Sequence, residues 1–72
     1  MSYVEEVANE LAEKALADEA RTGDDKIVVR IGDILGASSQ TLQESYLTFV
    51  RVRRAEARAR ALLAERAGTT DA

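Results

Sequence analysis

Apolar residues in the first third of the chain recur at spacings of three and four residues, which is typical of one face of an amphipathic helix. These positions are Val4, Val7, Ala8, Leu11, Ala15 and Leu16. Ser2 and Glu5 have the spacing of a capping box, in which each side chain accepts a hydrogen bond from the backbone N–H of the other residue. Gly23 supplies a stop at the other end. The pattern predicts a core-facing helix over residues 3–22.

The next segment, residues 26–31 with the sequence KIVVRI, is rich in β-branched residues. Lys26 and Arg30 alternate with apolar neighbours, and this alternation is typical of a short strand. The segment also fits the start of a helix in which Ile31, Ile34 and Leu35 share one face. The sequence leaves strand and helix open here, and the helical alternative ends at about residue 36.

A second apolar stripe begins at Leu42, and nothing interrupts a helix over residues 39–67. Its members are Leu42, Tyr46, Phe49, Val52, Ala55, Ala59 and Leu62. At 1.5 Å per residue this helix is about 43 Å long, too long for a compact monomer of this size to cover. A domain so small also buries only about 60% of its unfolded surface. We therefore predict a homodimer in which part of the long helix packs against a second copy. A frayed tail is expected after this helix, at residues 69–72.

Residues 28–47, VVRIGDILGASSQTLQESYL, fit two helices joined by a tight turn at Gly36, with Ser38 or Ser39 as the N-cap of the second helix. Starting from Val28, the small and aliphatic positions continue at Ile31, Gly32, Leu35, Gly36 and Leu42, whereas Ser45 departs from the pattern. The segment thereby resembles the helix-turn-helix DNA-binding motif. The resemblance implies that the second helix enters the major groove of DNA.

A strand at residues 26–31 would give a different resemblance, to the ribbon-helix-helix repressors. A single strand must pair with that of a second copy, and the resemblance then implies that Lys26, Val28 and Arg30 face the DNA. Such proteins need a full helix after the strand, whereas Gly36 leaves room for only about one turn from Gly32. The helix-turn-helix interpretation is therefore favoured.

Charge is segregated along the chain, whose net charge is −3. Residues 1–25 hold eight acidic and two basic residues, and residues 51–72 hold six Arg and three acidic residues. Arg51, Arg54 and Arg58 share one helical flank, where they would form a ridge that contacts DNA phosphates. The alternative is that these Arg side chains pair with the acidic first helix. The sequence pI of about 4.9 is also lower than is usual for DNA-binding domains.

The predicted DNA-contacting residues are those on the face of the motif that does not pack against the core. If Ile31, Leu35 and Leu42 point inward, polar side chains line the outer surface at the start of the second helix. Ser and Gln side chains at that place can contact base edges. The full candidate set is Ser38, Ser39, Gln40, Gln43 and Glu44 for the bases, with Arg51, Arg54 and Arg58 for the phosphates.

Enzymatic chemistry has little support, because the chain contains neither His nor Cys. We expect no catalytic residues, no cofactor and no metal. No apolar run approaches the roughly 20 residues that a membrane span requires, and the absence of Cys gives no reason to expect an oxidising compartment, so we expect a cytoplasmic protein.

The sequence thus predicts a single, mainly all-α domain of three helices, and the helix-turn-helix resemblance implies that it binds double-stranded DNA as a dimeric transcriptional regulator. The alternative is an acidic dimeric interaction module that does not bind DNA, such as an adaptor, an antitoxin-like binder or an inhibitor. Such a module would present its first helix to a protein partner through Glu6, Glu10, Glu13 and Asp18.

Overall fold

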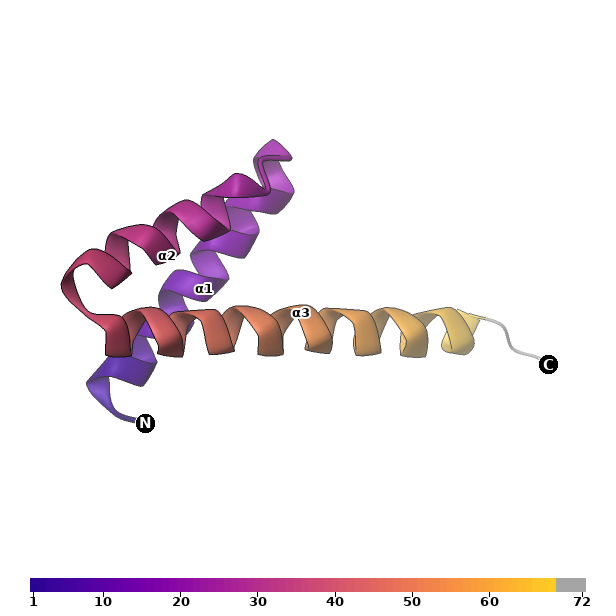
Figure 1. Ribbon diagram of the computed structural model, residues 1–72. Coiled ribbons are helices and arrows are strands. Elements are labelled where there is room, and N and C mark those ends of the chain that lie inside the picture. The colour runs from indigo at the N-terminus through magenta and orange to yellow at the C-terminus, as the bar shows by residue number, and fades with distance from the viewer. Residues whose placement is uncertain (69–72) are drawn as a thin grey trace.

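The computed structural model describes residues 1–68, and in this range the chain forms three α-helices and no strand. They are α1 (Tyr3–Thr22), α2 (Lys26–Ser38) and α3 (Gln40–Gly68). In Figure 1, α1 and α2 form a hairpin that lies against the first half of α3, whereas the second half of α3 projects beyond both. The predicted all-α, three-helix fold is confirmed. The tail expected at residues 69–72 lies outside the described residues.

Helix α1 begins and ends at the predicted residues because both of its ends are fixed by local hydrogen bonds. The Ser2 hydroxyl accepts from the Glu5 backbone N–H at 3.1 Å, and the Glu5 carboxylate accepts from the Ser2 backbone N–H at 3.0 Å. The bond from the Ser2 backbone lowers the pKa of Glu5 and so favours the carboxylate form. At the other end, Gly23 adopts a left-handed φ of 77° and donates to the Glu19 carbonyl.

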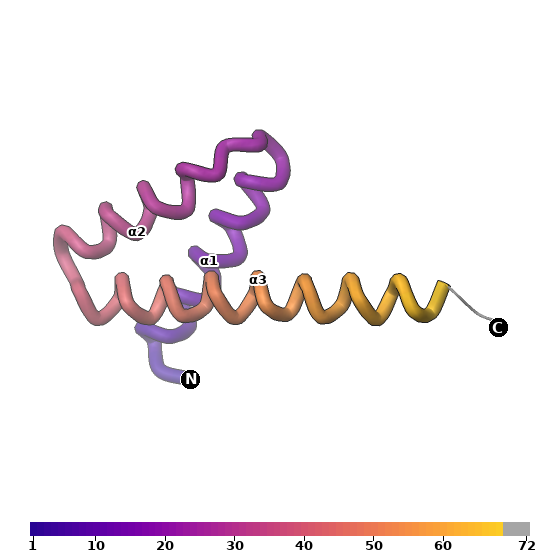
Figure 2. Tube along the Cα trace, turned by 45° about the vertical axis from the view of Figure 1, so that its right-hand side comes forward, coloured from indigo at the N-terminus to yellow at the C-terminus, as the bar shows by residue number. Residues whose placement is uncertain are grey.

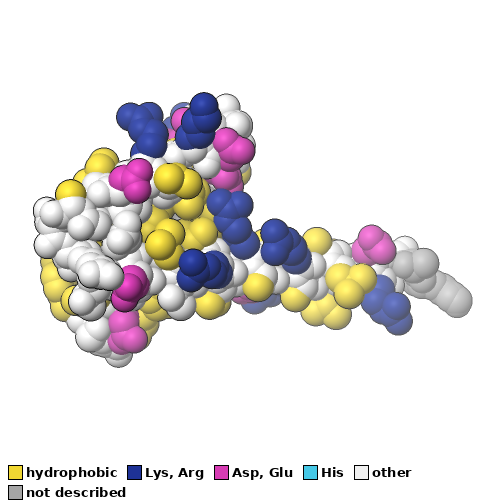
Figure 3. All heavy atoms as spheres, viewed as in Figure 1, with side chains coloured by type: hydrophobic (Ala, Val, Ile, Leu, Met, Phe, Trp, Pro, Cys, Tyr) yellow, Lys and Arg dark blue, Asp and Glu magenta, His cyan; other side chains and the backbone are white. Residues whose placement is uncertain are grey.

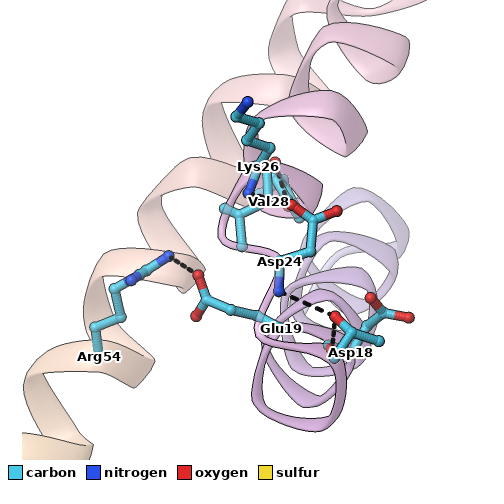
Figure 4. A network of polar contacts seen from close by, with 8 residues as sticks. Asp18, Glu19, Asp24, Lys26, Val28 and Arg54 are labelled. Carbon is cyan, nitrogen blue, oxygen red and sulfur yellow. Dashed lines mark hydrogen bonds and ion pairs between the residues drawn. The ribbon is translucent and has the colours of Figure 1, made fainter.

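The strand considered for residues 26–31 is wrong, since these residues are the first turns of α2. The Asp24 carboxylate accepts from the Lys26 backbone N–H at 2.9 Å, which satisfies one of the free donors at the start of the helix (Figure 4). Helical geometry buries Val28 against the core, while Val29 and Arg30 remain exposed. The ribbon-helix-helix alternative, which needs this strand, is excluded with it.

The predicted break at Gly36 is also wrong, because α2 continues to Ser38. Gly32 and Gly36 lie one turn apart and allow α3 to approach. A Cβ atom at Gly32 would lie 3.6 Å from the Tyr46 ring, and one at Gly36 would lie 2.5 Å from the Gln43 amide. The true break is the extended residue Ser39, whose hydroxyl accepts from the Leu42 backbone N–H at 3.1 Å as the predicted N-cap of α3.

The core is small and is centred on Tyr46, whose side chain has no exposed surface. Three small residues of α1 (Ala8, Ala12 and Ala15), Val28 of α2, and Tyr46 and Val50 of α3 form it. The Tyr46 hydroxyl donates to the Val28 carbonyl at 2.7 Å and so joins α3 to α2. Burial raises the pKa of Tyr46, because the phenolate form would lose its hydration. Ile31, Leu35, Leu42 and Phe49 pack against this core from its edge, as the inward pattern predicts.

The apolar stripe predicted along the long helix does not stay on one face of α3. The steps from Tyr46 to Phe49, Val52 and Ala55 are three residues each, and each step falls about 60° short of a full helical turn. After three such steps the stripe has moved to the opposite side of α3. Tyr46 is fully buried, but Val52 is 54% exposed.

The second half of α3 extends past the hairpin of α1 and α2 (Figure 2). The Cα radius of gyration of the chain is 14.9 Å, compared with about 11 Å expected for a compact domain of this length. From Ala55 to Gly68 every residue is exposed. The molecule is therefore a small helical head with a projecting helical arm.

Candidate nucleic-acid interface

The corner between α2 and α3 holds the residues predicted to contact DNA bases. Ser38, Gln40 and Glu44 are exposed there, and the Gln40 amide donates to the Glu44 carboxylate at 3.2 Å. Ser39 is half-buried because its hydroxyl caps α3. Three of the five predicted residues therefore remain on an accessible surface.

Gln43 does not lie on this outward surface. Its side-chain amide donates to the Gly32 carbonyl at 3.0 Å and lies over Gly36, so it connects α3 to α2. The position of Gln43 depends on the space that the two glycines leave between the helices. In the sequence Gly36 has the pattern of a helix stop, and this pattern gives no sign of the contact between Gln43 and α2.

The predicted Arg ridge divides into paired and unpaired side chains. The Arg54 guanidinium contacts the Glu19 carboxylate of α1 at 3.3 Å, with the two side chains 40% and 22% exposed (Figure 4). Arg54 thus follows the alternative in which the basic helix pairs with the acidic one. Arg51 and Arg58 are exposed, and within residues 1–68 neither has a carboxylate at ion-pair distance.

Arg53 is a structural residue that the sequence reasoning did not single out. Its guanidinium donates twice to the Asn9 side-chain oxygen of α1, at 3.1 and 2.9 Å. The sequence signal for it was weak, because Asn9 and Arg53 are far apart in the chain and are brought together only by the crossing of α1 and α3. Arg60 pairs within its own helix with Glu56 at 2.8 Å.

Basic side chains occur on both α2 and α3 on one face of the molecule. Figure 3 shows Lys and Arg side chains along α2 and at intervals along α3, with hydrophobic side chains in the hollow between the two helices. The exposed basic residues of α2 are Lys26 and Arg30. Acidic side chains interrupt this face, so it is a mixed surface in which individual Arg side chains, rather than a continuous basic patch, are available to an anion.

The outer side of α1 is acidic. Glu6, Glu10 and Glu13 are exposed and are separated by four and three residues, so they lie on one face of the helix. Asp18, the fourth predicted acidic residue, is turned toward Arg21 and pairs with it at 2.7 Å. The free acidic surface is therefore confined to the first three turns of α1.

Within residues 1–68 the acidic side chains form no group of three or more that could hold a metal ion. None of the helices in this described part has an apolar stretch of the kind that crosses a membrane. Comparison with known proteins found no matching family model and no significantly similar curated protein or solved structure.

Proposed function

We propose that this protein binds double-stranded DNA through the exposed basic side chains of α2 and α3. The observation that carries the proposal is the accessibility of Arg30, Arg51 and Arg58, which have no acidic partner among the described residues. Guanidinium groups that are free in the unbound protein can bind DNA phosphates, and so release the counterions condensed on the DNA, without first breaking an internal ion pair.

The spacing of the two α3 residues supports the same ligand. Arg51 and Arg58 are seven residues apart and share one flank of the helix, which separates them by about 10 Å along its axis. The major groove of DNA is about 12 Å wide, so two such side chains can reach phosphates on its walls. Ser38, Gln40 and Glu44 are the exposed polar residues at the corner, and they are the candidates for contacts to base edges.

The test is a salt titration of binding to a random-sequence duplex. Arg58→Ala and Arg30→Ala should each weaken binding to every sequence alike, and each should reduce the slope of log K against log salt by about one. Arg60→Ala is the matched control. It also removes one positive charge from α3, but Arg60 is already paired with Glu56 of the same helix. If the parent protein binds no duplex at low salt, or if the control lowers the slope as much as Arg58→Ala does, the proposal is wrong.

The second candidate function is an acidic interaction module, and the exposed row of Glu6, Glu10 and Glu13 favours it. The discriminating experiment replaces these three residues together with Gln. Under this alternative, the parent binds a lysine-rich peptide at low salt but binds no duplex, and the triple variant loses the peptide. A DNA-binding protein gives the reverse, with duplex binding in the parent that is stronger still in the triple variant.

A further inference from the structure

The projecting half of α3 carries an apolar stripe that is not covered by α1 or α2. Val52 and Leu62 are 54% and 55% exposed, and Ala55 and Ala59 lie between them in an exposed segment. These four residues, called the arm seam below, are separated by three, four and three residues. The spacing is that of alternate core positions in a coiled coil.

The same spacing continues back along α3 through small polar residues. Thr48, Ser45 and Thr41 precede Val52 at intervals of four, three and four residues, and Thr41 and Thr48 are exposed. Tyr46 and Val50 of α3, which face the head, lie on the other side of the helix. Over the first half of α3, a helix approaching along this line therefore meets only small polar side chains, on the side of α3 opposite the residues that pack against the head; beyond Leu62 the same spacing leads to Arg66.

We propose that the arm seam is occupied by the α3 helix of a second copy of this chain, in a parallel and in-register coiled coil. In that arrangement each layer of the seam pairs identical residues, so that Val52 meets Val52 and Leu62 meets Leu62. The small Ala residues between them allow the two helices to approach closely. The inference does not rest on DNA binding, because it is argued from the apolar positions of α3, which Arg51 and Arg58 flank, and it holds equally for a protein that binds no duplex.

The charges beside the arm seam decide the orientation. Arg51 and Glu56 lie on its two flanks, five residues apart, and in a parallel pair each Arg51 faces the Glu56 of the second copy. An antiparallel pair that matches Val52 with Leu62 has its twofold axis near residue 57. It would place Glu56 beside Glu56 and Arg58 beside Arg58, and like charges in these positions are unfavourable.

The first experiment measures the mass of the protein in solution by sedimentation. The parent should have twice the 7.8 kDa chain mass at about 100 µM. Ala59→Glu should raise the dissociation constant at least about tenfold, because it places two carboxylates in the seam. Ala57→Glu is the matched control, since Ala57 is equally exposed on the same arm but lies on the side away from the seam.

A monomeric parent at this concentration overturns the inference, as does an Ala57→Glu variant that dissociates as readily as Ala59→Glu. Both variants alter exposed positions, so neither should change the helical content of the protein. Far-ultraviolet circular dichroism measures this content. A dimer that fails to bind any duplex contradicts the proposed function but leaves the inference about the arm seam intact.

The second experiment tests the orientation with a single introduced thiol, which the natural absence of Cys makes unique. Leu62→Cys should give a covalent dimer on mild oxidation. A parallel pair brings the two equivalent Cα atoms close to the separation of about 4.4–6.8 Å that disulfides require. In the antiparallel pair they would lie about 15 Å apart. Ala57→Cys is the control on the opposite side. If the two variants cross-link at the same rate, the parallel arrangement is wrong.

Discussion

The Tyr46 hydroxyl is the most informative single group to remove, because it makes the buried hydrogen bond that joins α3 to α2. Tyr46→Phe keeps the ring in the core and deletes only the bond to the Val28 carbonyl, which is 2.7 Å long. That carbonyl also belongs to the helical hydrogen-bond ladder of α2, so it is not left without a donor. We therefore expect a loss of about 1 kcal/mol in the free energy of unfolding, the net contribution of one such bond.

A loss of this size is measurable in so small a protein. For a chain of this length the total free energy of unfolding is about 4–11 kcal/mol, and a loss of about 1 kcal/mol lowers Tm by about 4–8 °C. The assay is thermal unfolding at one fixed protein concentration, because self-association would shift Tm by mass action. Tyr3→Phe is the matched control, since Tyr3 is 79% exposed and its hydroxyl makes no hydrogen bond among the described residues. If the two variants have the same Tm, the Tyr46 bond does not stabilise the fold.

The same residue gives the protein an alkaline limit. Burial raises the pKa of Tyr46 in the folded state above its unfolded value. Its contribution to stability is therefore complete below about pH 10, the ordinary pKa of tyrosine, and is lost as the pH rises through the folded pKa. The Tm advantage of the parent over Tyr46→Phe should stay constant up to about pH 10, the ordinary pKa of tyrosine, and shrink as the pH rises above it. A difference that remains constant well above about pH 10 would contradict the assignment of Tyr46 as a desolvated phenol.

The two glycines of α2 and the Arg54 pair give three further expectations. Gly32→Ala should raise the free energy of unfolding by about 0.5–1 kcal/mol, because a Cβ there makes ordinary contacts and alanine favours the helix; a lower Tm would show that α2 and α3 are closer than described. Gly36→Ala should be nearly neutral, since the same gain is offset by displacement of the Gln43 amide from its bond to Gly32, and unchanged hydrogen exchange at α2 would argue against that displacement. A double-mutant cycle between Arg54 and Glu19 should give a coupling below about 1 kcal/mol that weakens with salt, because both side chains are partly exposed; a larger, salt-independent coupling would mean that the pair is more deeply buried.

The sequence by itself determined the features that depend on residues close together in the chain. Both ends of α1 were predicted to the residue, because the capping box of Ser2 and Glu5 and the left-handed Gly23 act within one helical turn. The N-cap role of Ser39 is local in the same way. The inward positions Ile31, Leu35 and Leu42 were also predictable, since each follows from the helical period of its own segment.

The tertiary structure alone decided how the helices use their neighbours. Gly36 reads as a stop in the sequence but permits close packing once α3 lies over it, and that packing turns Gln43 from the outer surface to the Gly32 carbonyl. Arg54 faces Glu19 rather than solvent because α1 and α3 cross there, which no local pattern specifies. The continuous stripe predicted on α3 was divided for a geometric reason: three successive steps of three residues carry it around the helix, so Tyr46 faces the head while Leu62 faces away from it.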